Sequence, residues 1–452
     1  YSIVFSKIAS IINIMDINYN SDVIVIGAGP CGIAAALEVA RGGKKVVLIE
    51  KGEHPGSKNM YGGAVYDSAL REVFGNEVDY LPYERIINSH TWSFLNDTGS
   101  FDMTYKNSSS RHAYAIKRFN LEKWMVEIAK KNGVYYIPNT LVEDLIIKDG
   151  YVTGIKTSLE EYYAPVSIIA DGVNSLLARK LNLRDDFKPY DMILSAKETI
   201  KLDKKVIESR FNLSEDNSNG VCKMYFGGLK EYKNIFMMSF LYTFKDTIML
   251  GVGANLADLS KNKLNINKII DEIKLHPDII PLIEGGKTIE YSAHLIPETG
   301  FNKMPELVAP GAILAGDAAG FINSVHFEGT NYALISGKLA GEAALCALNN
   351  NDFSVNTLSV YKKKLLKSFI LKDLYTYRNI IHKLYSRSNS LSYYYPYKIK
   401  EFFEIVTSAN CYSKSSQFKK FLFNFIKDRS LSELIKDIKA FSRCAFDMLS
   451  GK

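Results

Sequence analysis

A glycine-rich turn near the start of the chain constrains the fold more than any other feature. Residues 23–26 (VIVI) predict a short buried strand, and the turn GAGPCG follows at 27–32. A helical stretch, IAAALEVAR, leads to a second apolar strand, KVVLIE, that ends in Glu50. This order of strand, glycine turn, helix, strand and acid predicts an α/β fold with a Rossmann-type unit that binds a dinucleotide.

Each residue type in this unit has a physical reason. Gly27, Gly29 and Gly32 permit a tight turn and leave the backbone bare, so that a pyrophosphate can approach the N-terminus of the helix. Glu50 follows at the distance where a carboxylate can accept hydrogen bonds from a ribose. The unit does not distinguish NAD from FAD.

Two later segments favour FAD. Residues 164–175 (APVSIIADGVNS) predict a strand that ends at Asp171, and residues 307–320 (LVAPGAILAGDAAG) predict another that ends at Asp317. A carboxylate at the end of such a strand can bind a sugar-alcohol hydroxyl, and FAD has a ribityl chain where a nicotinamide cofactor has none. Three strand-end sites so far apart in the sequence suit a long, extended cofactor. The chain has no second G-x-G-x-x-G unit for a nicotinamide cofactor.

Together these motifs resemble the glutathione-reductase-type FAD fold, in the branch that aromatic hydroxylases share with geranylgeranyl reductases. Further stretches narrow the resemblance: PGSKNMYGG (55–63), GDAAGFINSVHFEGTNYALISGKLAGEAA (316–344) and SFILKDLYTYRN (368–379). They are similar to the FixC branch of the electron-transfer-flavoprotein–quinone oxidoreductase family. The similarity covers roughly residues 22–380 and weakens beyond 390.

The resemblance implies where FAD binds. The expected cofactor-binding residues are Gly27, Gly29, Pro30, Cys31, Gly32, Glu50, Lys51, Lys58, Asn59, Gly62, Gly63, Arg118, Val142, Asp171, Gly172, Gly316, Asp317, Gly329, Thr330 and Asn331. By resemblance, Asp317 holds the ribityl chain and Arg118 lies near the phosphate and ribityl region. A surface arginine at a helix start is the alternative reading of Arg118. The helix that Gly329 and Asn331 open would direct its N-terminus at the pyrimidine end of the flavin.

No catalytic acid or base stands out in the sequence. Tyr61 and His326 are the candidates near the flavin, and packing within the turn is the alternative role of His326. The five cysteines lie far apart and form no C-x-x-C pair, so we expect no metal site and no iron–sulfur cluster.

Three functions agree with this site. The resemblance implies an FAD-containing electron-transfer dehydrogenase that accepts electrons from an electron-transfer flavoprotein and passes them toward quinone or a separate small ferredoxin. The alternative is an FAD-dependent geranylgeranyl (isoprenoid lipid) reductase, although KNMYGG (58–63) lacks the cysteine that related reductases often carry there. A third is a flavin subunit that only relays electrons within a complex.

The resemblance and the pattern of elements predict a discontinuous organisation. Residues 1–20 form an N-terminal extension, and residues 351–452 form a basic helical region. The FAD-binding domain is expected at 21–80, 112–185 and 290–350, and an inserted antiparallel β-rich domain for substrate or partner at 81–111 and 186–289. Within the latter, residues 235–254 read as a hairpin whose turn surrounds Lys245.

The charge is concentrated at the C-terminal end. Residues 361–452 hold 19 lysines and arginines against 7 acids, a net charge of +12 in a chain whose total is +7. Residues 416–441 read as one helix with an apolar stripe, which suits either packing on the core or contact with an anionic membrane. The run LSYYYPY (391–397) reads as a loop. Isolated cysteines favour the cytoplasm, peripheral to the inner membrane face if the helix binds lipid, and we expect no nucleic-acid partner.

Overall fold

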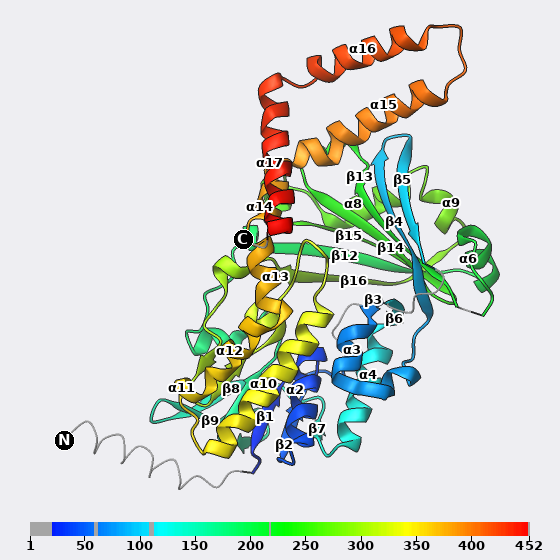
Figure 1. Ribbon diagram of the computed structural model, residues 1–452. Coiled ribbons are helices and arrows are strands. Elements are labelled where there is room, and N and C mark those ends of the chain that lie inside the picture. The colour runs from blue at the N-terminus through cyan, green and yellow to red at the C-terminus, as the bar shows by residue number, and fades with distance from the viewer. Residues whose placement is uncertain (1–19, 58–61, 108–112, 217, 451–452) are drawn as a thin grey trace.

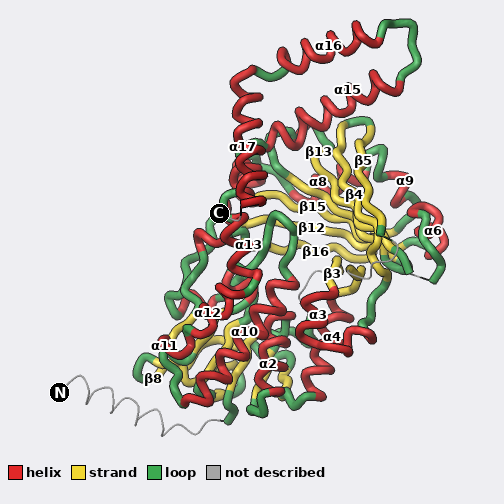
Figure 2. The backbone as a smooth tube through the Cα atoms, in the orientation of Figure 1, coloured by secondary structure: helices red, strands yellow, loops and turns green. Residues whose placement is uncertain are grey.

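Two large sheets, a small three-stranded sheet and a projecting helical arm make up the described part of the molecule. The computed structural model describes residues 20–57, 62–107, 113–216 and 218–450. Figure 1 shows one sheet with its helices in the lower half, a larger sheet above it, and the C-terminal helices rising beyond the larger sheet. The tube in Figure 2 shows the same division, with strands concentrated in the upper half and helices around the lower one. The predicted N-terminal extension, Lys58, Asn59 and Tyr61 lie outside the described residues.

The lower sheet is the Rossmann-type unit that the sequence predicts. Its strand order is β17-β18-β11-β1-β2-β7, parallel except for β17. The strands are β1 (Val23–Ile26), β2 (Val46–Ile49), β7 (Tyr135–Ile137), β11 (Val166–Ile169), β17 (Val308–Ala309) and β18 (Ala312–Leu314). Strands β1 and β2 are apolar at every position, and β11 differs only at the buried Ser167, because both faces of a parallel sheet are covered by other elements. A small antiparallel sheet lies beside it, formed by β8 (Val142–Lys148), β9 (Tyr151–Thr157) and β10 (Glu161–Tyr163).

Two helices of this unit pack unusually closely. Helix α2 (Pro30–Arg41) follows the glycine turn, and α10 (Thr330–Asn350) lies against it. A Cβ atom at Gly337 would lie 2.0 Å from the carbonyl oxygen of Cys31, and one at Gly341 would lie 2.7 Å from that of Ala35. Because backbone meets backbone at both points, no side chain fits there. The other helices of this half are α3 (Asp67–Phe74), α4 (Arg118–Lys131) and α5 (Leu176–Lys180).

The upper sheet is mostly antiparallel and has the order β16-β12-β15-β14-β13-β4-β6-β3, with β5 paired to β4. Its strands are β3 (Gly62–Tyr66), β4 (Arg85–Asn96), β5 (Gly99–Lys106), β6 (Ala113–Lys117), β12 (Met192–Lys201), β13 (Gly220–Gly227), β14 (Met237–Thr243), β15 (Thr247–Asn255) and β16 (Lys287–Pro297). Helices α6 (Lys204–Phe211), α7 (Leu256–Lys261), α8 (Ile266–Lys274) and α9 (Ile280–Ile283) complete this half. The hairpin predicted at 235–254 is confirmed as β14 and β15.

Helix α8 covers one face of the upper sheet. Ile269, Ile270 and Ile273 of α8 pack in one core with alternate residues of β12, β14 and β15. The opposite face carries a second apolar cluster that includes residues of β3 and β6. This face therefore belongs to both halves of the molecule.

The strands cross the segment boundaries expected from the sequence. Strands β3 and β6 come from the segments assigned to FAD binding, yet they join the upper sheet through β4. Residue 290, expected as a boundary, lies within β16, which pairs with β12 along its whole length. Backbone pairing continues across these positions because an interrupted strand would leave buried N–H and C=O groups unpaired.

The C-terminal region is helical but differs from the sequence prediction in two places. Its helices are α11 (Val355–Leu358), α12 (Val360–Lys367), α13 (Phe369–Tyr377), α14 (Ile380–Tyr385), α15 (Tyr395–Thr407), α16 (Lys414–Lys427) and α17 (Leu431–Ser450). The run 391–397 is not a loop, because a π-helical turn (Ser390–Tyr394) leads directly into α15, with Pro396 in its first turn. The single helix expected at 416–441 is two helices, broken at residues 428–430.

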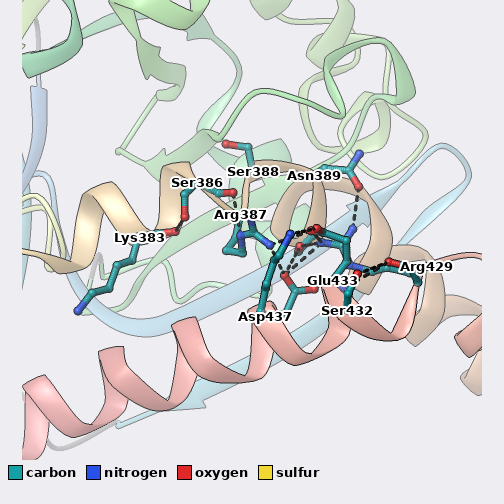
Figure 3. Close-up of polar contacts among 12 residues, drawn as sticks. Lys383, Ser386, Arg387, Ser388, Asn389, Arg429, Ser432, Glu433 and Asp437 are labelled. Carbon is teal, nitrogen blue, oxygen red and sulfur yellow. Dashed lines mark hydrogen bonds and ion pairs between the residues drawn. The ribbon is translucent and has the colours of Figure 1, made fainter.

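A buried carboxylate explains that break. Asp437 of α17 is fully buried and accepts hydrogen bonds from Arg429 (Nε, 2.8 Å), Ser390 (2.9 Å) and Tyr395 (3.1 Å). Figure 3 shows Arg387 and Arg429 directed at it from two separate segments. Arg429 reaches Asp437 because the chain turns between α16 and α17, and the resulting contacts tie the arm to the segment after α14.

Candidate cofactor site

The glycine turn forms an open helix N-terminus. Gly27 has a φ of 99°, and a Cβ atom there would lie 2.5 Å from the carbonyl oxygen of Ala170. A Cβ atom at Gly32 would lie 1.9 Å from the oxygen of Gly27, whereas one at Gly29 would meet nothing within 4 Å. Helix α2 begins at Pro30 without a side-chain cap. Its first N–H groups and the positive end of its dipole therefore face free space, where an anion can bind.

Glu50 fixes the shape of this turn. Its carboxylate accepts hydrogen bonds from the backbone N–H groups of Ala28 (2.9 Å) and Gly52 (2.7 Å). The backbone N–H of Thr140 donates to the carbonyl oxygen of Glu50 (2.8 Å), which brings the start of β8 at Val142 to the same side. Each carboxylate oxygen keeps a lone pair for a ribose hydroxyl. Lys51 follows directly and is exposed.

Two aspartates lie at the ends of neighbouring strands. Asp171 follows β11, Asp317 follows β18, and these strands pair beside β1. The Oδ1 atom of Asp171 is buried and has no hydrogen-bond partner among the described residues. Burial raises the pKa of Asp171 and raises that of Asp317 to about 6, while the charge of Arg118 opposes the shift at Asp317. Both carboxyls can thus accept hydroxyl donors at the edge of the sheet where the glycine turn lies.

Small residues hold the segment around Asp317 against α2. Gly316 has a φ of 64°, and a Cβ atom there would lie 2.9 Å from the Cβ of Cys31. The hydroxyl of Ser336 accepts a hydrogen bond from the backbone N–H of Gly316 (3.2 Å). Burial raises the pKa of Cys31 to about 12, so this thiol is a packing group and not a nucleophile. Gly172, beside Asp171, has a φ of 82° and open space above it.

Arg118 is more than a surface arginine. It is the first residue of α4, it forms an ion pair with the buried Glu122, and its charge acts on Asp317. The helix α10 begins at Thr330 after Gly329, as the sequence predicts, and no side chain caps it. The Oδ1 atom of Asn331 is buried without a partner among the described residues. Gly63 lies in β3 with open space above it.

His326 lies in the environment that its packing alternative predicts. Its side chain is exposed, and its ring packs edge-on against Tyr377 of α13 with centroids 4.9 Å apart. Its backbone N–H donates to Asn323 Oδ1 (3.2 Å). His326 is therefore engaged with the C-terminal helices.

Sequence reasoning missed one buried cation at this site. Lys197 of β12 donates a hydrogen bond from Nζ to the carbonyl oxygen of Gly62 at 2.5 Å. Its charge acts together with that of Arg118 on His294 of β16, which is also mostly buried. The signal was present in the sequence, because Lys197 directly follows the uncharged run MILSA in a segment that reads as a strand.

The residues present fit FAD. The open N-terminus of α2 suits a pyrophosphate, the strand-end acids Asp171 and Asp317 suit hydroxyl groups, and the uncapped N-terminus of α10 suits a polar ring edge. When bound, FAD supplies transfer of a hydride or of single electrons. The chain's own residues would bind and orient it at the sheet edge where the glycine turn and the two strand-end aspartates lie.

The fold and site define an FAD-dependent oxidoreductase, and the family model described as FAD dependent oxidoreductase matches residues 22–178. The chain belongs to the FixC family. It is 36% identical to Protein FixC of Escherichia coli K12 over 79% of this chain and 84% of that protein. It is 35% identical to Protein FixC of Bradyrhizobium diazoefficiens over 93% of this chain and 98% of that protein.

Solved structures share the fold. A geranylgeranyl bacteriochlorophyll reductase-like protein from Thermoplasma acidophilum superposes with a TM-score of 0.71 at 21% identity, covering 93% of this chain and 98% of that one. The halogenase PltM, solved with phloroglucinol and FAD, superposes with a TM-score of 0.63 at 14% identity, covering 93% and 86%. Both likenesses support the glutathione-reductase-type architecture.

Membrane-spanning helices and metal clusters are both absent from the described residues. Among them, no helix has the length and apolar character needed to cross a membrane. Within the same ranges, no three His, Cys, Asp or Glu side chains gather as a metal site requires.

Proposed function

We propose that this chain accepts electrons from an electron-transfer flavoprotein and passes them toward quinone, with a separate small ferredoxin as a further electron carrier. The similarity to FixC proteins along 93% of the chain supports this proposal. The observation that carries it is the partly exposed apolar cluster on the face of the upper sheet turned away from α8. An electron-transferring flavin needs an accessible apolar surface for its acceptor more than it needs a nucleophile.

That surface is built from alternate residues of three strands. On β13 and β14, directly opposed positions bring Met224 beside Phe240 and Phe226 beside Met238. Phe226, Met238 and Phe240 are half-buried, and the same cluster includes Ala64 of β3, next to the glycine pair. Methionine and aromatic side chains adapt to a flat apolar ring, so the face suits a quinone.

An isoprenoid chain would fit the same apolar face, and the reductase function therefore remains the competing candidate. The two candidates separate in one anaerobic experiment. Purified protein with FAD is mixed with reduced electron-transfer flavoprotein, and the flavin absorbance of each protein is followed. In parallel, reduced protein is incubated with a geranylgeranyl lipid, and the product mass is measured.

We expect the bound FAD to be reduced by the flavoprotein and reoxidised by a quinone analogue, while the lipid keeps its mass. The Asp317→Ala variant serves as the control that lacks the predicted ribityl anchor. A flavin that stays oxidised beside the reduced flavoprotein, together with a lipid that gains hydrogen, would replace our proposal with the reductase function.

We further propose that the helical arm touches an anionic membrane surface on the cytoplasmic side. The apolar stripe expected on residues 416–441 has a half-buried aromatic part and an exposed aliphatic part. Its aromatic residues are half-buried, with Phe418 and Phe421 packed against Phe402 of α15. Leu422 and Ile426 are 60% and 56% exposed, as is their neighbour Phe423 at 66%. Exposed lysines of α16 flank them: Lys419, Lys420 and Lys427. Apolar and basic groups on one helix surface suit an anionic interface.

Vesicle flotation tests the arm. The double variant Leu422→Ser/Phe423→Ser removes exposed apolar area without touching the buried Asp437, so the arm should stay folded. We expect it to lose binding to vesicles that contain anionic lipid. Ser415→Ala on the same helix is the matched control. Equal flotation of the double variant and the control would remove the membrane from the proposal.

A further inference from the structure

Lys197 is a buried lysine in the middle of a strand, where an apolar side chain would pack as well. It lies in the middle of β12, between β15 and β16, and only 4% of its surface is exposed. It is on the sheet face turned away from α8, because its neighbour Ala196 belongs to the core under that helix. Its Nζ donates a hydrogen bond to the Gly62 carbonyl, at the start of β3.

The described surroundings of the Lys197 side chain exclude water but supply no opposite charge in direct contact with the ammonium group. Directly opposite on β15 is Gly251, where a Cβ atom would lie 2.3 Å from the ring of Phe240 and 2.9 Å from the Cβ of Lys197. The lysine stem therefore passes beside an aromatic ring over a bare backbone. No described carboxylate forms an ion pair with its ammonium group. Removing an unpaired cation from water costs free energy of folding. A lysine at this position is therefore explained better by a functional role than by stability.

The charged groups that face Lys197 come from two other elements. Arg118 of α4 and Glu290 of β16 act on it, and His294 lies diagonally across on the same face of β16. Burial lowers the pKa of Lys197 to about 7, the charge of Arg118 lowers it further, and Glu290 opposes them. Arg118 also acts on Asp317, so the same small region contains the predicted ribityl anchor and the lysine.

We propose that Lys197 is an electrostatic positioning residue for FAD, which holds the Gly62 backbone at the cofactor and favours the reduced over the oxidised state. Two-electron reduction of a flavin with uptake of one proton adds one negative charge, and the protonated ammonium group of Lys197 stabilises that charge at pH values below its pKa. The inference needs only the FAD cofactor. It is independent of which partner supplies the electrons.

Redox titration tests this role without any turnover assay. The midpoint potential of bound FAD is measured by equilibration with a reference dye in wild-type protein, Lys197→Met and Lys197→Gln. We expect each uncharged variant to bind reduced FAD, relative to oxidised FAD, at least about tenfold less well, which is a potential lower by about 30 mV for a two-electron couple. Lys197→Arg keeps the charge and should stay near the wild type.

Lys201→Met is the matched control, because Lys201 ends the same strand but is exposed and pairs with Asp246. Its potential should equal that of the wild type. Potentials of Lys197→Met or Lys197→Gln that also equal the wild type would overturn the proposal. Loss of FAD binding in both uncharged variants would overturn it as well, because Lys197 would then hold the fold and not the potential.

Discussion

The glycine turn and the helical arm are shaped by opposite kinds of constraint. At the turn, backbone approaches backbone so closely that Gly32 and Gly337 leave no room for a Cβ atom. In the arm, long charged side chains meet over a distance, with Arg387 and Arg429 both directed at Asp437. The close backbone approach at the turn can be predicted from glycines that are neighbours in the sequence. The ion pairs of the arm cannot, because Arg387 and Asp437 are 50 positions apart. Four substitutions can test this contrast, in order of decreasing effect.

The largest effect should come from Gly32→Ala. The new methyl group would lie within 2 Å of the Gly27 oxygen, and neither backbone segment can move without breaking the Rossmann unit. We expect a loss of about 5 kcal/mol or more in the free energy of unfolding, measured by denaturant titration. Gly29→Ala is the matched control, since its Cβ meets nothing within 4 Å. Gly29→Ala should keep its stability but bind FAD more weakly, because the pyrophosphate then meets a methyl group. Equal stability loss in both variants would contradict the close-approach argument.

Asp437→Ala should rank second. It removes one partner from a buried charge network and leaves Arg429 and Arg387 mostly buried without it. Breaking a buried pair in this way costs about 3–4 kcal/mol. Hydrogen exchange should show faster exchange in α16 and α17 alone, with FAD binding unchanged. Equally faster exchange in α2 would mean that the arm and the cofactor site unfold together.

A pH effect should rank third, at the junction of the two regions. Glu298 follows β16 and accepts a hydrogen bond from Tyr385 of α14, while its Oε1 atom is buried without a partner among the described residues. It lines a cavity of about 30 Å³ with Thr299 and His382. Burial raises the pKa of Glu298 from 4.5 to about 7. Between these values the folded state binds more protons than the unfolded state, so stability falls as the pH rises and is lowest above pH 7.

The loss should amount to roughly 3 kcal/mol at most across that range, because each pKa unit corresponds to about 1.4 kcal/mol. Glu298→Gln cannot ionise and should lack this part of the pH dependence, which thermal unfolding at several pH values will reveal. If the stability of wild type and variant changed equally with pH, the pKa of Glu298 would not be raised in the folded state. Glu127→Gln, at an exposed acid of α4 in the other half of the molecule, provides the comparison.

The smallest effect should come from Leu422→Ser. This side chain is 60% exposed and makes no contact that holds the arm in place, so stability should change by less than about 0.5 kcal/mol. Thermal unfolding measures the change. Phe421→Ser, one residue earlier but packed against Phe402, should cost clearly more. The reverse order would mean that α16 is rotated relative to the structure described here.

Features encoded by neighbouring residues could be predicted from the sequence, and features that depend on distant residues could not. The strand–turn–helix unit, the aspartates at the strand ends and the β14–β15 hairpin are encoded by residues next to each other, and the structure contains them where they were predicted. The break at 428–430 could not be predicted because only Asp437, brought close by tertiary packing, turns Arg429 inward. The helical state of 391–397 was missed because Pro396 suggested a loop, although it occupies the first turn of α15 where no N–H is needed.

The candidate site was predicted in part. The backbone positions follow from glycine spacing, but Lys197 is more than 130 residues from Gly62 in the sequence and meets it only in the assembled upper sheet. His326 lies beside the expected site in the sequence, yet its ring packs on Tyr377. The roles of the individual cofactor-binding residues, including Lys58, Asn59 and Tyr61 outside the described ranges, stay predictions.

The position of β18 has a consequence for how the protein is made. Strand β11 pairs with β18 along one edge, and α10 covers α2. Both partners are synthesised late, since residue 350 at the end of α10 emerges from the ribosome about 300 residues after α2. At about 5–20 residues per second, the nascent chain waits on the order of 7–30 s with the edge of β11 unpaired, and on the order of 15–60 s with α2 uncovered. During this interval an apolar strand edge is open to non-native pairing, and the FAD site is complete only once α10 has been synthesised.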